Sequence, residues 1–143
     1  MDRQNSIIQA EMTELEKVVD SVEQKKKERK VVHIFPHSHT DEGWLAKAED
    51  FFTGADTAIF FGSVKDILDT TILELIANKN RTFAYAELKY FKMWFERQDN
   101  VMQEKVRTLV KNGQLDLVGG GWSAPDEATT TYDQIADNFQ IGH

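Results

Sequence analysis

Hydrophobic residues recur at helical spacing over residues 6–30. Apolar side chains stand three and four positions apart, as on one face of an amphipathic helix: Ile8, Met12, Leu15, Val19 and Val22. The pattern spans only about two heptads, too few for a coiled coil, and ends in a cationic run at 25–30 that suits a helix C-terminus. We therefore predict an amphipathic helical lead-in over residues 1–30. A basic membrane-surface or targeting patch is the alternative to a solvated helix end.

Beyond residue 30 the hydrophobic pattern alternates between two periods. Short apolar runs predict strands at 31–35, 82–86 and 114–118, and helical stripes predict helices at 64–78, 90–97, 101–112 and 132–142. Ser63 is placed to cap the first of these helices, and Gly113 to end the third. Parallel strands alternating with helices define an α/β fold class, which we predict for a single domain over residues 31–143.

Length, charge and composition narrow the classes of protein. A chain of 143 residues can bury the core of one modest domain. Its net charge of −7 argues against a nucleic-acid-binding face. It has no cysteine, which excludes disulfides and thiolate metal ligands, and no apolar run long enough for a membrane span. The first residues do not resemble a signal peptide, and nothing in the composition predicts a compartment.

Two histidines and an aspartate alternate just beyond the first predicted strand, in the stretch His37-Ser-His39-Thr-Asp41. In an extended backbone, residues two apart point to the same side. His39 and Asp41 can therefore converge on one divalent ion, and imidazole nitrogen with carboxylate oxygen is a donor pair suited to zinc. His33 and His37 are interpreted as structural, with His37 a candidate for orienting His39.

The other two predicted strands also end in polar residues. Sites in parallel α/β folds form beyond the carboxyl ends of strands, where Glu87 follows the second strand and Asp126 the third. The glycines at 119–121 lack the phosphate-loop pattern, so they are expected to turn the chain and present Trp122 and Asp126. Trp44 and Trp122 are candidates to wall a sugar-binding pocket, with placement in the core as the alternative.

The segment at 36–44, Pro-His-Ser-His-Thr-Asp-Glu-Gly-Trp, resembles the opening signature of the glycoside hydrolase family 38 α-mannosidases. Further motifs follow in the order of that family: Asp66-Ile-Leu-Asp-Thr70, Phe83-Ala-Tyr-Ala-Glu87 with Phe91 and Trp94, Gly113-Gln-Leu-Asp116, Gly120-Gly-Trp122 and Pro125-Asp-Glu-Ala128. The resemblance covers residues 31–143. It implies that this region is an incomplete, amino-terminal portion of the α/β-barrel catalytic domain of the family.

The resemblance also implies roles for individual residues. His39, Asp41 and Asp126 match the zinc ligands of the family, Asp126 matches its catalytic nucleophile, and Trp44 matches the tryptophan that lines the subsite for the cleaved mannose. The implied function is that of a zinc-dependent retaining α-mannosidase, with Zn²⁺ as cofactor and a mannose-containing glycan as partner. Family members often reside in the Golgi, lysosome or vacuole.

Several departures from the family pattern leave alternatives open. Thr40 and Glu42 stand where the signature more often has asparagine and proline. The fourth zinc ligand and the acid/base aspartate of the family lie downstream of His143, so we expect little or no turnover from these 143 residues alone. The alternatives are an inactive metal- or sugar-binding fragment, self-associating through an open sheet edge, and a metal-dependent hydrolase of another class, such as a deacetylase.

Overall fold

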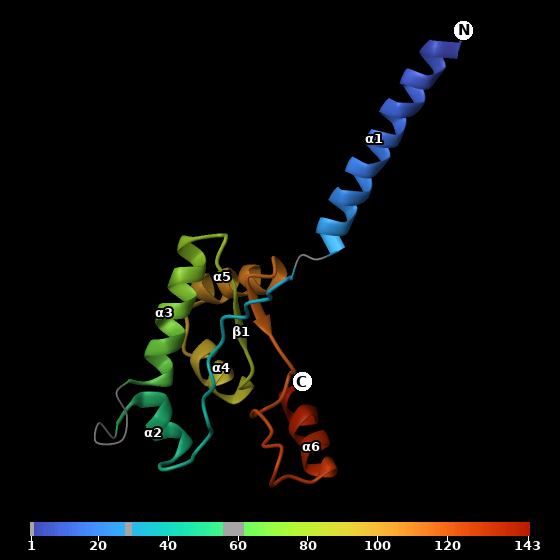
Figure 1. Cartoon of the computed structure of the whole chain (residues 1–143). Coiled ribbons are helices and arrows are strands. Elements are labelled where there is room, and N and C mark those ends of the chain that lie inside the picture. The colour runs from blue at the N-terminus through green and yellow to red at the C-terminus, as the bar shows by residue number, and fades with distance from the viewer. Residues whose placement is uncertain (1, 28–29, 56–61) are drawn as a thin grey trace. The chain divides into compact units, whose positions relative to one another are not determined.

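A single long helix, α1 (Asp2–Lys27), dominates the first of two units into which the chain divides, Met1–Ile34 and Phe35–His143 (Figure 1). The computed structural model describes residues 2–27, 30–55 and 62–143. It confirms the helix predicted for the lead-in, whose described apolar stripe is solvent-exposed: Met12, Leu15, Val19 and Val22. The side chains of Ile8 and of residues 25–29 lie outside the described part. None of the described helices is long and apolar enough to cross a membrane.

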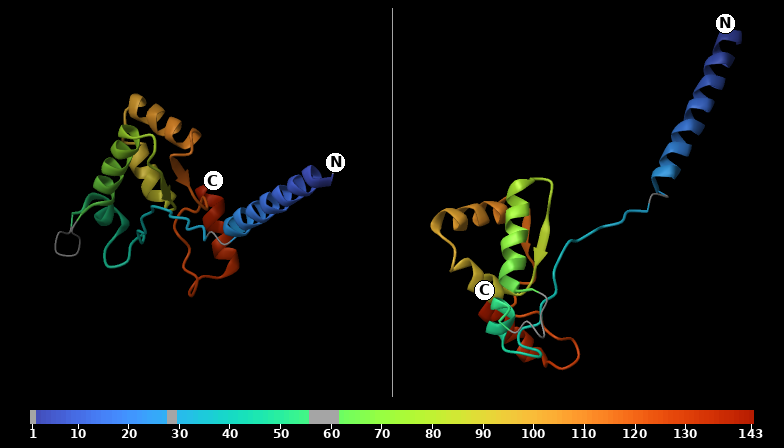
Figure 2. Two further views of the ribbon diagram at one scale, coloured as in Figure 1. Left: turned by 45° about the horizontal axis from the view of Figure 1, so that its top comes forward. Right: turned by 90° about the vertical axis from the view of Figure 1, so that its left-hand side faces the viewer.

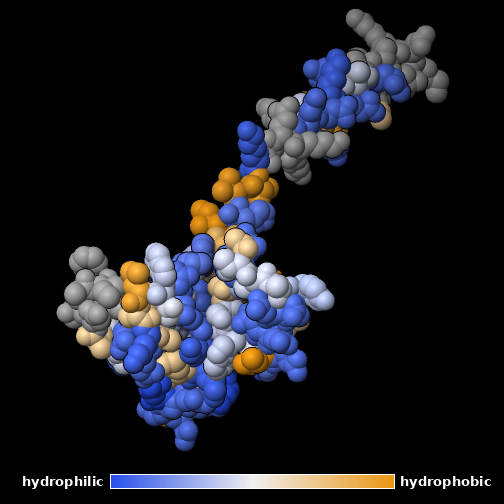
Figure 3. Space-filling view, turned by 90° about the horizontal axis from the view of Figure 1, so that it is seen from below, coloured by the Kyte–Doolittle hydropathy of each residue, from blue (hydrophilic) through white to orange (hydrophobic). Residues whose placement is uncertain are grey.

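The strand predicted at residues 31–35 is wrong. Residues 31–36 have no regular secondary structure, and their apolar side chains are exposed, Ile34 to 82% (Figure 3). Pairing with the sheet begins only afterwards: the Pro36 carbonyl oxygen accepts the Ala84 N–H at 2.8 Å, and His37 forms an isolated parallel bridge with Ala84. An apolar, β-branched run favours extended backbone, but a strand also requires a neighbour to satisfy its backbone groups.

The other two predicted strands form a parallel pair in the second unit. β1 (Phe83–Tyr85) lies beside β2 (Leu115–Leu117), with Phe83 opposite Leu115 and Tyr85 opposite Leu117. The crossover between them consists of α4 (Leu88–Phe95) and α5 (Asn100–Lys111). This arrangement confirms the predicted alternation of parallel strands and helices. The barrel stays an expectation from the family resemblance.

Helices gathered around this strand pair form the core of the second unit (Figure 2). α3 (Val64–Ala77) packs against α2 (Ala48–Thr53), α4 and α5. The buried apolar residues are Phe52, Val64, Leu68, Ile72, Leu75, Tyr85, Tyr90, Trp94, Val106, Leu109 and Leu115. Apolar positions of α3, α4 and α5 thus share one core, which is the packing that stabilises short helices. Ile67 of the predicted stripe is 42% exposed, and α6 contributes no buried residue.

Helix ends follow the capping residues in the sequence. The Ser63 hydroxyl accepts the Asp66 N–H at 3.0 Å, which starts α3 as predicted. Asp99 caps α5 in the same way, since its carboxylate accepts the Met102 N–H at 2.7 Å. Gly113 follows α5 with φ of 77°, a left-handed conformation that glycine adopts without steric cost. α6 (Tyr132–Gly142) has the predicted bounds.

The short helix α2 was not predicted by the sequence pattern. It has six residues, too few to show helical periodicity, and Phe52 is its one buried side chain. The Phe52 ring stacks on the Tyr90 ring of α4 with centroids 6.5 Å apart. Tertiary contact with α4 and the αL turn at Gly54, where φ is 70°, therefore define this helix.

Candidate active site

The segment that carries His39 and Asp41 runs past the carboxyl end of β1. The backbone N–H of Thr40, between the two, donates to Glu87 Oε1 at 3.1 Å. The Tyr90 hydroxyl donates to the Asp41 carbonyl oxygen at 3.2 Å. Glu87 comes two residues after β1, and Tyr90 lies in the first turn of α4. The structure thus places His39 and Asp41 at the end of the sheet at which parallel α/β folds form their sites.

The loop that follows β2 forms the opposite wall of the site. The backbone N–H groups of Leu88 and Lys89 donate to the carbonyl oxygens of Gly121 and Trp122, at 3.2 and 3.0 Å. A helix leaves its first N–H groups without intrahelical partners, and here the loop after β2 satisfies two of them. The start of α4 consequently holds both walls in place, because Glu87 binds one wall and Leu88 and Lys89 bind the other.

Helix α6 braces the same loop from its other side. The Asn138 side chain accepts the Ser123 N–H at 2.9 Å and donates to the Ser123 carbonyl at 2.7 Å, while the Asn138 carbonyl accepts the Trp122 N–H at 3.1 Å. A Cβ at Gly142 would collide with the carbonyl oxygen of Gly120, so the end of α6 contacts bare backbone. The glycines therefore allow a close approach of helix and loop.

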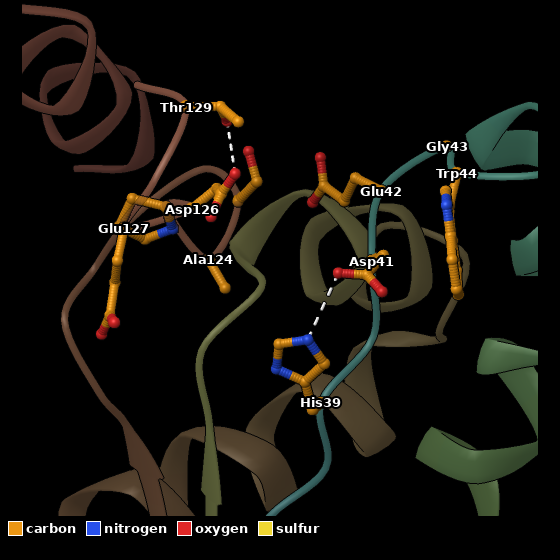
Figure 4. A pocket seen from close by; sticks show the side chains of 11 residues that line it. His39, Asp41, Glu42, Gly43, Trp44, Ala124, Asp126, Glu127 and Thr129 are labelled. Carbon is orange, nitrogen blue, oxygen red and sulfur yellow. Dashed lines mark hydrogen bonds and ion pairs between the residues drawn. The ribbon is translucent and has the colours of Figure 1, made fainter. Parts of the chain in front are cut away.

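A pocket of about 810 Å³ lies between these two walls (Figure 4). One wall contributes His39, Asp41, Glu42, Gly43 and Trp44, and the other contributes residues 123–127 and Thr129. All four residues that the family resemblance marks as functional line this pocket: His39, Asp41, Trp44 and Asp126. The Trp44 side chain is 73% exposed, which leaves its ring available to a ligand. Trp122, in contrast, is half-buried and lies outside the lining of this pocket.

The predicted metal ligands share the pocket without being assembled around one point. His39 Nε2 lies 3.2 Å from Asp41 Oδ1, whereas Asp126 turns toward its own loop (Figure 4), where it accepts hydrogen bonds from the Thr129 hydroxyl and, at 3.1 Å, the Ala128 N–H. Among the described residues, no three His, Asp or Glu side chains are grouped closely enough to hold a metal ion.

Hydrogen bonding favours the ionised form of Asp126. The Thr129 hydroxyl and the Ala128 N–H hold the pKa of this carboxyl below its usual range. Asp126 is therefore ionised at neutral pH, as a nucleophile or a metal ligand must be.

The ring of His37 contacts the backbone of its own segment, since His37 Nδ1 lies 3.0 Å from the Phe35 carbonyl oxygen. The suggestion that His37 orients His39 stays a prediction.

Glu42 is a pocket residue whose importance sequence reasoning missed. Its side chain is only 7% exposed, and its Oε2 lies 3.6 Å from the Lys89 ammonium. Burial raises the pKa of Glu42 to about 7, because the loss of hydration outweighs the attraction of Lys89. The one signal in the sequence was that Glu42 departs from the family signature at a position next to a predicted ligand.

Glu87 was predicted either to hydrogen-bond near the site or to cap the strand end, and the structure shows the first. It is 1% exposed, and the Thr40 N–H is the recorded partner of its Oε1. We expect Glu87→Ala to lower the free energy of unfolding by about 1–3 kcal/mol, because the Thr40 N–H then loses its acceptor. Glu87→Gln should lose less, since its amide oxygen can still accept that bond. Urea unfolding followed by circular dichroism measures both changes.

The control for Glu87 is Asp116→Ala, which removes an exposed carboxylate from β2. Surface substitutions of this kind usually change stability by less than about 0.5 kcal/mol. Equal stability of Glu87→Ala and Asp116→Ala would show that the Thr40 contact does not fix the segment that carries His39 and Asp41.

Comparison with known proteins identifies the family. The model of the glycosyl hydrolases family 38 N-terminal domain matches residues 29–143. A lysosomal alpha-mannosidase of Dictyostelium discoideum is 42% identical over 112 residues, that of Homo sapiens 41% over 111, and an alpha-mannosidase of Canavalia ensiformis 38% over 112. The chain belongs to glycosyl hydrolase family 38, as its motifs predicted.

The matched region covers 78% of this chain and 11% of each of these relatives. The chain thus spans about a tenth of the length of the curated relatives it matches. Membership in a glycosidase family argues against the alternative of a hydrolase of another class, such as a deacetylase.

Proposed function

We propose that this chain forms the amino-terminal part of a zinc-dependent retaining α-mannosidase that hydrolyses α-linked mannose in glycans. The pocket carries the proposal, because it brings together His39, Asp41 and Trp44, from the segment before α2, with Asp126, from the loop after β2. The relatives reported above, all of them named alpha-mannosidases, point to α-linked mannose as the substrate.

The donor set fits zinc in its chemistry. His39 and Asp41 offer an imidazole nitrogen and a carboxylate oxygen 3.2 Å apart, close enough to bind a single ion together. Asp126 supplies a third oxygen across the pocket, after a rotation that exchanges its hydrogen bonds with Thr129 and Ala128 for the metal. When bound, the metal would supply a Lewis acid that orients the hydroxyl groups of the sugar.

Two residues of the pocket then have roles in hydrolysis. The ionised carboxylate of Asp126 would attack the anomeric carbon and displace the leaving-group oxygen, as retaining glycosidases require. The exposed ring of Trp44 would pack against the apolar face of the sugar and hold it next to Asp126. A second carboxyl group must protonate the leaving oxygen, and the resemblance assigns it to a residue downstream of His143.

A second candidate function is binding of the sugar or the metal without catalysis. It is favoured by the hydrogen bonds from the Thr129 hydroxyl and the Ala128 N–H, which hold the proposed nucleophile Asp126 to its own loop. This candidate shares the pocket with the first and differs only in the absence of turnover.

Binding and hydrolysis measured together test the proposal. We expect the chain, freed of metal with EDTA, to take up one Zn²⁺ by calorimetry. The zinc form should bind methyl α-mannoside more tightly than its C2 epimer methyl α-glucoside, as observed by NMR. Little release of nitrophenol from an aryl α-mannoside is expected, because no residue of this chain is assigned as the acid that protonates the leaving oxygen. Slow release that Asp126→Asn abolishes would support the enzyme, and release that Asp126→Asn leaves unchanged would favour the second candidate. Failure to bind zinc, or equal binding of the two epimers, would contradict the proposal.

A further inference from the structure

The carboxylate of Glu42 is a buried hydrogen-bond acceptor at the edge of the candidate active site. Its side chain lines the pocket and is 93% buried, being only 7% exposed. Figure 4 shows it projecting from the wall of His39 and Asp41 toward the loop that carries Asp126. Oε2 lies 3.6 Å from Lys89 Nζ, whereas Oε1 is buried and has no hydrogen-bond partner among the described residues.

The other carboxylates of the pocket differ from Glu42 in this respect. Asp41 contacts His39, Asp126 accepts two hydrogen bonds within its own loop, and Glu127 is exposed to solvent. A buried acceptor without a donor is costly and rare in folded proteins. The unpartnered oxygen of Glu42 therefore indicates a ligand that supplies the missing donor.

The neighbours of Glu42 define the chemistry of that ligand. The ammonium group of Lys89 at 3.6 Å disfavours a second metal ion beside this carboxylate, since like charges repel. A neutral hydroxyl group can donate to Oε1 without such repulsion. The exposed ring of Trp44, two residues along the chain, provides an apolar surface for the same ligand. A sugar has both features, because its ring carries hydroxyl groups and also presents an apolar face.

We propose that Glu42 binds a hydroxyl group of the sugar and helps to select the substrate, an inference that rests on the proposed α-mannosidase function. Glu42 would accept the hydrogen bond through Oε1 while Lys89 holds Oε2. The backbone of Lys89 is fixed, because its N–H donates to the Trp122 carbonyl at 3.0 Å. Because Oε1 is buried, the Glu42 side chain must turn toward the pocket to accept from the sugar, and the new hydrogen bond then satisfies an oxygen that has no partner without it.

A series of monodeoxy analogues of methyl α-mannoside tests the proposal. The chain with Zn²⁺ should bind one analogue about tenfold more weakly than the parent sugar, because the analogue lacks the donor for the buried Glu42 oxygen. Glu42→Val should weaken binding of the parent about tenfold and should bind that analogue and the parent equally. Glu42→Gln, which keeps an uncharged acceptor, should give an intermediate preference. NMR titration measures each affinity, and Asp116→Asn, outside the pocket, is the matched control.

The outcomes separate this inference from the proposed function. If the unmodified chain binds methyl α-mannoside but Glu42→Val keeps its affinity or its preference among the analogues, Glu42 does not contact the sugar and the inference is wrong. If the unmodified chain fails to prefer methyl α-mannoside over methyl α-glucoside, the proposed function fails and the inference falls with it. Both Glu42 variants should fold, because the Lys89 side chain is 31% exposed and its ammonium can turn to solvent when the carboxylate is replaced. Their circular dichroism spectra check this.

Discussion

Trp94→Ala is expected to remove a large part of the stability of the second unit. The indole is 1% exposed and lies in α4, where its ring contacts Phe91 at 6.3 Å between centroids. Its Nε1 donates to Asp69 Oδ1 of α3 at 2.7 Å, so the side chain joins two helices by packing and by a hydrogen bond. Truncating a buried tryptophan costs about 3–5 kcal/mol, against a total of about 5–15 kcal/mol for a typical domain. Urea unfolding followed by circular dichroism measures the loss.

Trp94→Phe separates the two contributions of this residue. Phenylalanine keeps much of the ring volume but cannot donate to Asp69, which retains its ion pair with Lys65 at 3.0 Å. The cost should therefore be that of one hydrogen bond to a charged group, about 1.5–3 kcal/mol. Stability of Trp94→Ala equal to that of Trp94→Phe would contradict the assignment of Trp94 to the core between α3 and α4.

Acidification should weaken the same contact. Burial raises the pKa of Asp69, but the hydrogen bonds from Trp94 and Lys65 outweigh it and hold the pKa below its usual value of 3.8. A carboxyl with a lowered pKa stabilises the fold above its unfolded pKa, and this contribution is lost as the pH falls through the folded pKa. The difference in stability between the natural chain and Trp94→Phe should therefore shrink below about pH 4.

The elements that the sequence predicted correctly are those whose signals are local. α3 shows a helical stripe that follows the capping residue Ser63, and α5 ends just before Gly113. Each of these helices therefore has a boundary residue in its own sequence. The strand predicted at 31–35 and the helix α2 depend instead on distant partners. The first has no regular secondary structure over residues 31–36, and the second contains Phe52, which stacks on Tyr90. Local hydrophobicity cannot supply that information.

The candidate site likewise has features that the sequence predicted and features that depend on distant segments. The rule that sites form at the carboxyl ends of parallel strands placed His39, Asp41 and Asp126 at one edge, and the structure brings all three to one pocket. Their roles as ligands and nucleophile stay predictions. The turn that ties Asp126 to Thr129 and the burial of Glu42 follow from side-chain packing between distant segments, which periodicity does not describe.

The start of α4 explains how so small a sheet can build a pocket. Glu87 binds the backbone beside His39, and Leu88 and Lys89 bind the backbone that leads to Asp126. The two walls are therefore spaced by contacts to three consecutive residues. A metal ion bound by both walls would add a second link between them. Asp126 is the ligand proposed for the second wall, so metal binding should depend on the charge of its carboxylate.

Asp126→Asn is accordingly expected to weaken the binding of Zn²⁺ by about 100-fold or more. Mutating groups that only support a metal ligand typically costs 10- to 100-fold in affinity, so losing a charged ligand should cost at least as much. The substitution keeps the local turn, since the amide oxygen of asparagine can still accept the Ala128 N–H that Asp126 accepts at 3.1 Å. Calorimetric titration of the metal-free chain measures the affinity.

Glu127→Gln provides the matched control, because it removes one negative charge from the adjacent, exposed position in the same loop. Its effect should be limited to weak, screened electrostatics, a few-fold at about 0.15 M salt. If Asp126→Asn and Glu127→Gln weaken zinc binding equally while His39→Ala abolishes it, the metal is held by the His39 wall alone. Asp126 would then act only through its general negative charge. If Asp126→Asn has the far larger effect, the carboxylate must leave Thr129 to reach the ion, and Thr129→Val should then bind zinc more tightly, because no hydroxyl competes for the carboxylate.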